Sequence, residues 1–229
     1  MYKLFYSPGA CSLAVHILLE EIGDPYTLEE ISVKKGRTQS PEYLTVNPKG
    51  RVPALLAEGH LLTEAPAILV YLALTHPEKL LLPNDPMNHF RCLEWLNWLT
   101  STVHSVGYGQ YWRPQRFIGN QAQYAAVSAK GKENILDSYR YIEQQVKGRT
   151  WSVGESYSCV DPFLLVFYIW GNLIGVRMRT EFPAWSLLTD RVVERRPVQR
   201  ALDQEGLPRW ICVDPVSSTL ASIAGKFSV

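Results

Sequence analysis

Short apolar runs separated by turn residues fill the first third of the chain. Residues 2–6 (YKLFY) are apolar and aromatic and stop at a Ser-Pro-Gly turn at 7–9, which predicts a buried strand. From residue 11 onward, apolar positions crowd a helical window that closes at Gly23, a residue suited to the end of a helix. The partly alternating stretch 26–33 predicts a second strand. We therefore expect strand, helix and strand at the amino terminus.

Cap and turn signals organise the segment that follows. Ser40 before Pro41 marks the start of a short helix, with the serine as N-cap. Residues 47–50 (NPKG) are a turn signal. The apolar runs 52–56 and 61–62 are separated by a Glu-Gly pair, and this pattern predicts a β-hairpin.

Helices are expected from the end of this hairpin onward. One begins at Glu64, with Thr63 as its expected N-cap, and ends at His76 before a proline. Residues 80–86 contain two prolines, which predicts a first domain at 1–80, a linker at 81–86 and a second domain at 87–229. Four later segments have helical patterns and few strand signals: 87–106, 121–147, 160–176 and 184–195. The fold class is thus an α/β domain followed by an all-α domain. The tail 211–229 has no clear period, and its role stays open.

Composition and charge narrow the function classes. The 229 residues suffice for one or two domains, and 46% hydrophobic with 20% charged residues is typical of a globular protein. Lys and Arg number 23 against 22 for Asp and Glu, so no global field favours nucleic acid or an anionic membrane. The most apolar stretch, 163–176, is too short to cross a bilayer and predicts a buried core helix. Any substrate must therefore be selected by local groups.

The cysteines are dispersed and form no Cys-x-x-Cys pair. They stand at positions 11, 92, 159 and 212, which argues against a zinc site and against a disulfide-stapled secreted domain. The five histidines have no metal-ligand spacing, and the chain begins without the pattern of a secretory leader. We expect a protein of the reducing cytoplasm that holds no metal.

Cys11 has the placement of a reactive thiol. It lies just past a strand and turn, at the start of a helix, where free backbone N–H groups and the helix dipole favour the thiolate. The second position of a dithiol motif is Ala14, so any redox chemistry here is of the monothiol kind. A plain buried cysteine is the alternative.

Two other segments carry weaker signals. Pro53 follows a turn and opens a strand, where proline suits an edge, or where a cis bond leaves backbone groups free for a ligand. Glu64 and Ala65, at the start of a helix, combine a carboxylate with backbone N–H groups and suit an ammonium together with a carboxylate. Ordinary capping is the alternative for this helix start.

Taken together, these motifs resemble those of the cytosolic glutathione transferases, most closely the bacterial beta class. The resemblance rests on the ordered segments SPGACS (7–12), NPKGRVPAL (47–55) and LTEA (62–65), followed by a helical second half. It continues through EWLNWL, the pair Val103-His104 and the capping-box-like SCVD at 158–161, and it covers about residues 1–208. The resemblance implies a thioredoxin-like domain, a helical domain, and glutathione in the cleft between them.

By the same resemblance, Cys11 and His104 form the catalytic pair. Cys11 is expected to contact the glutathione sulfur and to be able to form a mixed disulfide with it. His104 approaches the same sulfur from the second domain, where an imidazole can donate a hydrogen bond to a thiolate or relay its proton. A surface or core histidine is the alternative for His104.

The resemblance also assigns the glutathione-binding residues. Pro53 matches the family's cis-proline, and the backbone of Val52 pairs with the cysteinyl part of glutathione like an added strand. Glu64 and the N–H of Ala65 hold the γ-glutamyl end.

The rest of the ligand is assigned to both domains. Lys35, or alternatively Lys34, meets the glycyl carboxylate, and Asn97 reaches toward the ligand from the first helix of the second domain. The electrophile site is expected among aromatic residues of the second domain. Its candidates are Tyr108, Tyr111, Trp112 and Trp170.

The resemblance implies an enzyme that conjugates glutathione to hydrophobic electrophiles in detoxification, as a homodimer, with glutathione as co-substrate and no other cofactor. Thiol-disulfide exchange or deglutathionylation through Cys11 is the first alternative. A non-catalytic ligand-binding or interaction protein with the same fold is the second.

Overall fold

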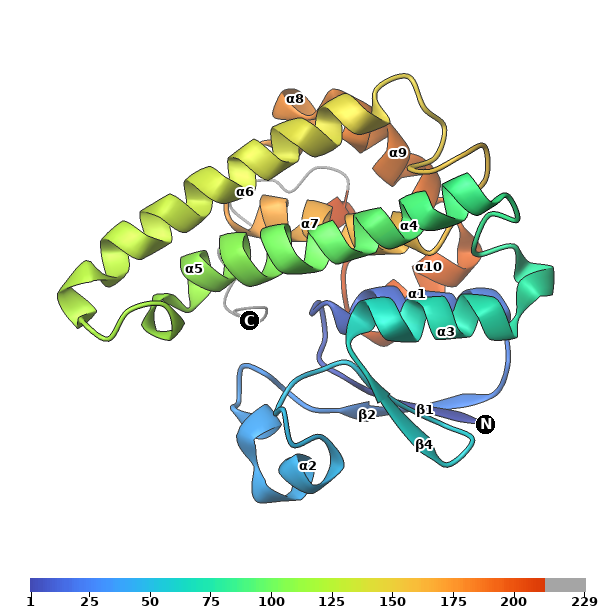
Figure 1. The fold of residues 1–229 in the computed structure, drawn as a ribbon, viewed down its shortest axis with the longest axis horizontal. Helices are drawn as coiled ribbons and strands as arrows, with labels where there is room; N and C mark the ends of the chain where they lie inside the picture. Colours follow the sequence, from blue (N-terminus) through green and yellow to red (C-terminus); the bar gives the residue numbers. More distant parts are fainter. Residues whose placement is uncertain (213–229) are drawn as a thin grey trace.

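A four-stranded sheet forms the framework of residues 1–80, which are called the first half of the chain below (Figure 1). The structure is a computed structural model that describes residues 1–212. Its strands are β1 (Tyr2–Tyr6), β2 (Tyr26–Glu30), β3 (Ala54–Ala57) and β4 (His60–Thr63), in the spatial order β2-β1-β3-β4. β2 runs parallel to β1, while β3 pairs antiparallel with both β1 and β4. The expected strand-helix-strand unit and the hairpin are confirmed.

Three helices accompany the sheet. α1 (Ser12–Ile22) and α3 (Ala65–Thr75) lie between the sheet and the second half of the chain, whereas α2 (Pro41–Val46) lies at one end of the sheet (Figure 1). Gly23 ends α1 in the left-handed region at φ 82°, where glycine adopts the backbone without steric cost. Ser40 caps α2, because its hydroxyl oxygen accepts the N–H of Tyr43 at 3.2 Å. Both expected helix boundaries are confirmed.

The expected cap of α3 is wrong. Thr63 is the last residue of β4 and pairs with Ala54 in the hairpin register, so it does not cap the helix. Glu64 occupies the N-cap position with φ 71° and ψ 117°, and its side chain makes no capping hydrogen bond. The hairpin extends one residue further than the local pattern indicated, and the turn into α3 falls on Glu64.

The second half is helical, as expected. Its elements are α4 (Pro86–Trp98), a π-helical segment (Leu99–Tyr108), α5 (Gly109–Trp112), α6 (Tyr124–Val146), α7 (Val160–Leu173), α8 (Met178–Glu181), α9 (Pro183–Val193) and α10 (Arg196–Gln204). The expected single helix over 87–106 is wrong in detail, because the chain widens to π-helical turns after Trp98. α10 was not predicted. The proposed division at residues 80–86 stays a prediction.

α7 forms the centre of the helical half. Its residues from Val160 to Asn172 are all buried, which confirms the expected core helix. The carboxylate of Asp161 accepts the backbone N–H groups of Ser152 and Ser158 at 3.0 and 2.7 Å, so the capping-box-like segment does hold the start of α7.

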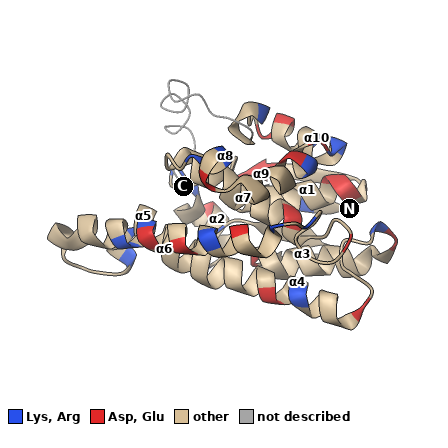
Figure 2. Cartoon of the chain, turned by 90° about the horizontal axis from the view of Figure 1, so that it is seen from above, with Lys and Arg blue, Asp and Glu red and all other residues tan. Residues whose placement is uncertain are grey.

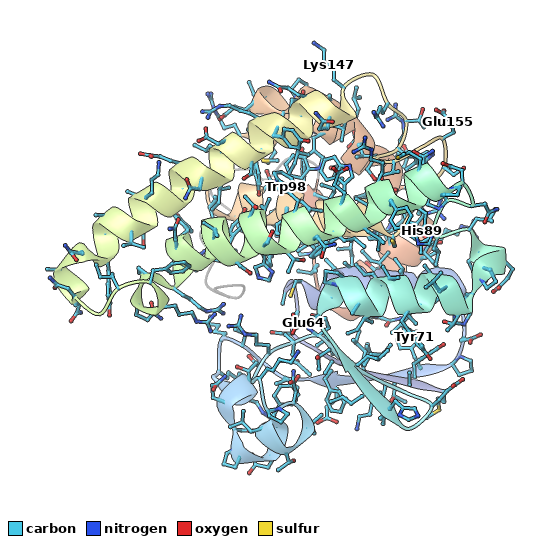
Figure 3. All side chains as sticks on the ribbon, viewed as in Figure 1. Glu64, Tyr71, His89, Trp98, Lys147 and Glu155 are labelled. Atoms are coloured by element: carbon cyan, nitrogen blue, oxygen red, sulfur yellow. The ribbon has the colours of Figure 1, made fainter. Side chains whose placement is uncertain are left out.

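The outer helices pack through aromatic contacts, and charges are spread over their surfaces. Trp98 lies between α4 and α6 (Figure 3), where its ring centroid is 5.0 Å from that of Tyr141. Figure 2 shows acidic and basic residues interspersed along the helices, as the small net charge of +1 leads one to expect. Within residues 1–212, none of the helices combines the length and the apolar character that a membrane span needs. Most of the expected tail, 213–229, lies outside the described residues.

Candidate active site

A cavity of about 330 Å³ lies where the two halves of the chain meet. The side chains that line it come from the start of α1, the segment after β2, the turn before β3, the start of α3, the segment from the π-helix to residue 117, and α7. Among the residues singled out in the sequence, the first half contributes Cys11, Val52, Pro53, Glu64 and Ala65, and the second half contributes His104, Tyr108 and Trp112. The cavity thus joins groups that are far apart in the sequence.

The remaining candidates lie outside the cavity lining. Lys35 and Asn97 are exposed, and the Asn97 amide donates to the carbonyl of Leu93 at 2.8 Å, within its own helix. Tyr111 is partly buried beside Trp112, with the ring centroids 6.2 Å apart. Trp170 is fully buried behind the cavity wall. The ligand-binding roles of these residues stay predictions.

Cys11 faces the turn before β3. Its thiol donates to the carbonyl of Val52 at 3.4 Å, and only 8% of the residue is exposed. Burial raises the pKa of the Cys11 thiol to about 12, an effect that the nearby charge of Arg113 only partly offsets. Burial thus acts against the thiolate, which the helix start was expected to favour. Cys11 is a protonated thiol at neutral pH.

The turn that presents Val52 is held by side chains of the preceding segment. The Tyr43 hydroxyl and the Asn47 amide both donate to the carbonyl of Arg51 at 2.7 Å. The Val52-Pro53 peptide is cis, as the resemblance implied. The Val52 backbone consequently lies at the cavity with its carbonyl toward Cys11.

Glu64 already has a cationic partner. Its carboxylate accepts the Lys49 ammonium at 2.6 Å, and the same ammonium donates to the Thr63 hydroxyl at 2.8 Å. Both members of this ion pair are about half exposed, so the contact adds little to stability. Lys49 was not singled out in the sequence, although the NPKG turn places it beside the hairpin.

His104 lies on the π-helical segment, with its ring against an aromatic wall. The ring centroid is 5.0 Å from that of Trp170, at 66° between the planes. Burial, together with the positive charges of Arg113 and Arg51, lowers the pKa of His104 from 6.5 to about 4. The imidazole is therefore neutral near pH 7, with one ring N–H that can donate a hydrogen bond and one ring nitrogen that can accept one.

The loop before Cys11 is clamped by the helical half. The Trp170 indole N–H donates to the Gly9 carbonyl at 2.8 Å, and the Gly9 N–H donates to the Glu205 carboxylate at 2.8 Å. The other oxygen of that carboxylate lies 2.9 Å from Nδ1 of His16. No local signal marks Glu205, which is separated from Gly9 by 196 positions in the sequence.

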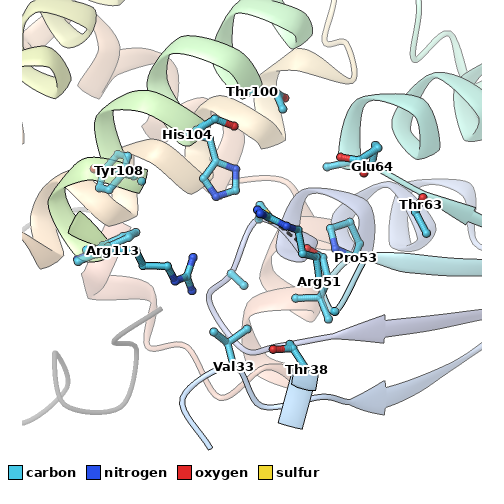
Figure 4. A pocket seen from close by; sticks show the side chains of 18 of the residues that line it. Val33, Thr38, Arg51, Pro53, Thr63, Glu64, Thr100, His104, Tyr108 and Arg113 are labelled. Carbon is cyan, nitrogen blue, oxygen red and sulfur yellow. Dashed lines mark hydrogen bonds between the residues drawn. The ribbon is translucent and has the colours of Figure 1, made fainter. Parts of the chain in front are cut away.

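The sequence reasoning also missed several polar residues of the lining, among them three arginines and Thr100. Arg51, Arg113 and Arg116 all line the cavity, and in the part of the chain that the structure describes none of them pairs with a carboxylate. In Figure 4 the Arg51 and Arg113 guanidinium groups and the His104 ring point toward one space. The Thr100 hydroxyl lines the same cavity, buried and without a partner among the described residues. The Arg-Pro-Gln-Arg run at 113–116 was the available signal.

Known proteins resemble this chain along most of its length. Residues 1–74 match the family model described as the glutathione S-transferase N-terminal domain. Glutathione S-transferase GstA of Escherichia coli O157:H7 is 36% identical over 208 residues, which cover 90% of this chain and 99% of that protein.

Two solved structures share the whole architecture. A glutathione transferase homologue from Sulfitobacter with bound glutathione has a TM-score of 0.85 at 30% identity, covering 91% of this chain and 99% of its own. A bacterial beta-class glutathione S-transferase of Sphingomonas chungbukensis has a TM-score of 0.78 at 31% identity, covering 90% and 100%.

The chain belongs to the glutathione S-transferase family. Its thioredoxin-like α/β sheet followed by a helical domain is the fold of these relatives, which confirms the expected fold class. Its function is that of a glutathione transferase, and its structural relatives include the bacterial beta class. Glutathione is the substrate bound in the Sulfitobacter structure.

Proposed function

We propose that this transferase conjugates the glutathione thiolate to hydrophobic electrophiles, and that the reaction takes place in the 330 Å³ cavity. The observation that carries the proposal is that groups from both halves of the chain line one cavity. Val52, Glu64 and Ala65 of the first half, the groups assigned to glutathione, line the same cavity as His104, Tyr108 and Trp112 of the second half. This arrangement provides both a place for a tripeptide and an apolar surface for the second substrate.

The proposed position of glutathione follows the first half. Its cysteinyl backbone pairs with Val52, and its γ-glutamyl carboxylate accepts the N–H of Ala65 at the start of α3. Its ammonium replaces Lys49 beside Glu64, a replacement that is supported by the exposure of that ion pair. Lys35 for the glycyl carboxylate and Asn97 for the far side of the ligand stay predictions.

The proposed chemistry starts with ionisation of glutathione. His104 is neutral because the pKa of its imidazole is near 4, so it relays the thiol proton to solvent and donates a hydrogen bond to the thiolate that forms. Arg51 then stabilises the thiolate electrostatically. The sulfur forms a C–S bond with the electrophilic carbon, and the leaving group departs with the electron pair of its former bond. Holding both reactants in one cavity supplies orientation.

A second candidate function is thiol exchange through Cys11. It is favoured by one observation, the Cys11 sulfur in the cavity lining. In this reaction the Cys11 thiolate attacks the glutathione sulfur of a mixed disulfide, an S–S bond forms, and the substrate leaves as its thiolate. A second glutathione thiolate then attacks the glutathione sulfur of this disulfide, so that oxidised glutathione forms and Cys11 leaves as its thiolate. The high pKa of Cys11, which burial raises to about 12, disfavours a fast first step.

One experiment separates these functions. Conjugation of 1-chloro-2,4-dinitrobenzene and reduction of a glutathione mixed disulfide are compared for the wild type, Cys11→Ala and His104→Gln. His60→Gln, at an exposed position of β4, is the matched control. We expect His104→Gln to lower conjugation by about a hundredfold and Cys11→Ala to abolish exchange only. Background rates in the wild type for both reactions would refute both functions and leave a non-catalytic binding protein.

The proposal includes a homodimer, a cytoplasmic location and a role in detoxification. The homodimer is supported by the exposed apolar side chains of Met87 and Phe90 on α4, which are 66% and 64% exposed. Light scattering of the full chain tests it, and a monomeric mass over the micromolar range would contradict it. The cytoplasmic location is supported by four free cysteines.

A further inference from the structure

The cavity carries more positive charge than its own acidic groups balance. Among the charged residues that line it, three are arginines (Arg51, Arg113 and Arg116) and one is a carboxylate, Glu64. That carboxylate already accepts the Lys49 ammonium at 2.6 Å. Burial and the charges of Arg116 and Arg51 lower the pKa of the Arg113 guanidinium, so this half-buried cation lacks compensation from the protein.

Glutathione accounts for part of this charge. In the proposed position its ammonium meets Glu64 and its γ-glutamyl carboxylate meets the Ala65 N–H, so two negative groups remain, the thiolate and the glycyl carboxylate. Arg51 adjoins Val52 and therefore lies on the glutathione side, while the exposed Lys35 is assigned to the glycyl end. The two arginines of the helical half are left without an assigned anion.

These two arginines flank the aromatic groups of the electrophile side. Arg113 directly follows Trp112, and Arg116 directly precedes Phe117. The turns between them are ordered by backbone hydrogen bonds, from the N–H of Arg116 to the carbonyl of Arg113 at 3.0 Å and from the N–H of Phe117 to that of Pro114 at 2.9 Å. A planar apolar surface and a guanidinium pair therefore lie on one short segment, and guanidinium groups bind carboxylates with directed hydrogen bonds.

We propose that the electrophile of this enzyme is itself an anion, an aromatic or unsaturated molecule that carries a carboxylate. Arg113 and Arg116 bind the carboxylate, while the planar body lies against Trp112 and Phe117. This inference rests on the proposed conjugation and adds the substrate class. It also provides a reason for a half-buried Arg113 that has no carboxylate partner within residues 1–212.

Two electrophiles that differ only in charge provide the test. In 4-chloro-3,5-dinitrobenzoate and its methyl ester, the glutathione sulfur bonds to the carbon that bears chlorine. Chloride leaves with the C–Cl electron pair, and the thiol proton passes to the buffer. Each enzymatic kcat/KM is divided by the uncatalysed rate constant with free glutathione, which removes the difference in intrinsic reactivity. The measured quantity is the resulting preference for the carboxylate.

We expect the wild type to prefer the carboxylate by about tenfold or more, and increasing salt to reduce the preference. Arg113→Gln and Arg116→Gln should each lower the preference by about tenfold, whereas Arg116→Lys, which keeps the charge but loses the guanidinium geometry, should lower it by less. Arg140→Gln is the matched control. This arginine is exposed on α6 and paired with Asp137 at 2.5 Å, and its loss should leave the preference unchanged.

Two results would overturn the inference. One is a wild type that treats both electrophiles alike; the other is arginine variants that lower both rates by the same factor, because the arginines would then serve glutathione alone. If neither electrophile reacts, the proposed conjugation fails, and binding of the two preformed glutathione conjugates decides instead. Tighter binding of the carboxylate conjugate, by about tenfold, supports an anion site, and equal binding refutes it.

Discussion

Replacing Trp170 by phenylalanine tests how the loop before Cys11 is held. Trp170 and Trp185 are both fully buried, but only the Trp170 indole N–H donates to a carbonyl, that of Gly9 at 2.8 Å. The Trp185 indole nitrogen has no hydrogen-bond partner among the described residues. Trp185→Phe is therefore a matched control, because both substitutions remove the same ring from a closely packed interior.

The hydrogen bond sets the difference between the two variants. Each loses about 1–3 kcal/mol of unfolding free energy through lost packing. Trp170→Phe also removes the hydrogen-bond donor of the Gly9 carbonyl, which lowers the unfolding free energy by a further ~1–3 kcal/mol. Trp185→Phe instead removes an unsatisfied N–H, which raises the unfolding free energy by about 1 kcal/mol. We expect Trp170→Phe to be the less stable variant by about 2–4 kcal/mol.

Urea unfolding at one fixed protein concentration measures this difference. Because the loop ends at Cys11, loosening it should also speed alkylation of that thiol in Trp170→Phe and not in Trp185→Phe. Equal losses of stability, together with equal alkylation rates, would refute the view that the indole holds the loop.

Three further outcomes follow from packing and protonation. Gly131→Ala should destabilise the protein by about 2 kcal/mol or more in urea unfolding, because a Cβ there would lie 2.5 Å from the backbone nitrogen of Tyr111. Gly119→Ala, with nothing within 4 Å, should change stability by less than about 0.5 kcal/mol, and equal effects would contradict the close approach. His104, with a folded pKa near 4 against 6.5 when unfolded, binds fewer protons in the folded chain, so stability falls as the pH drops from 6.5 to 4. The wild type should therefore lose about 2 kcal/mol more than His104→Gln between about pH 7.5 and about pH 5, and parallel stability curves would refute this. Since burial raises the pKa of Cys11 to about 12, iodoacetamide should alkylate it at least about a hundredfold more slowly than free glutathione near pH 7; a comparable rate would show that the thiol is not desolvated.

The elements predicted correctly are those whose signals are local. Gly23 ends α1 through its own backbone freedom, and Ser40 caps α2 through its own hydroxyl. The cap of α3 was misplaced because the pairing of Thr63 with Ala54 extends the hairpin. Pairing between strands depends on residues outside the few positions from which a helix cap is predicted. α10 escaped notice because only three of its residues are buried, too few for a clear apolar period.

Prediction of the site followed the same division. The family resemblance assigned Cys11, Val52 and His104 to one ligand, and all three residues line one cavity. The protonation of Cys11 could not be inferred in this way, since its thiol is desolvated by residues that are distant in the sequence. In the sequence, Arg113 and Arg116 have the pattern of exposed surface charges, and only the fold shows that they lie near the His104 imidazole.

The clamp on Gly9 has a consequence for recombination between relatives. The backbone of Gly9, two residues before Cys11, is hydrogen-bonded on one side to the Trp170 indole of α7 and on the other to the Glu205 carboxylate that follows α10. In a chimera that joins residues 1–80 to the helical half of a relative, the Gly9 loop keeps both hydrogen bonds only if that relative has an indole and a carboxylate at the equivalent positions. In evolution and in engineering alike, the two halves of this enzyme are exchangeable only as a matched set.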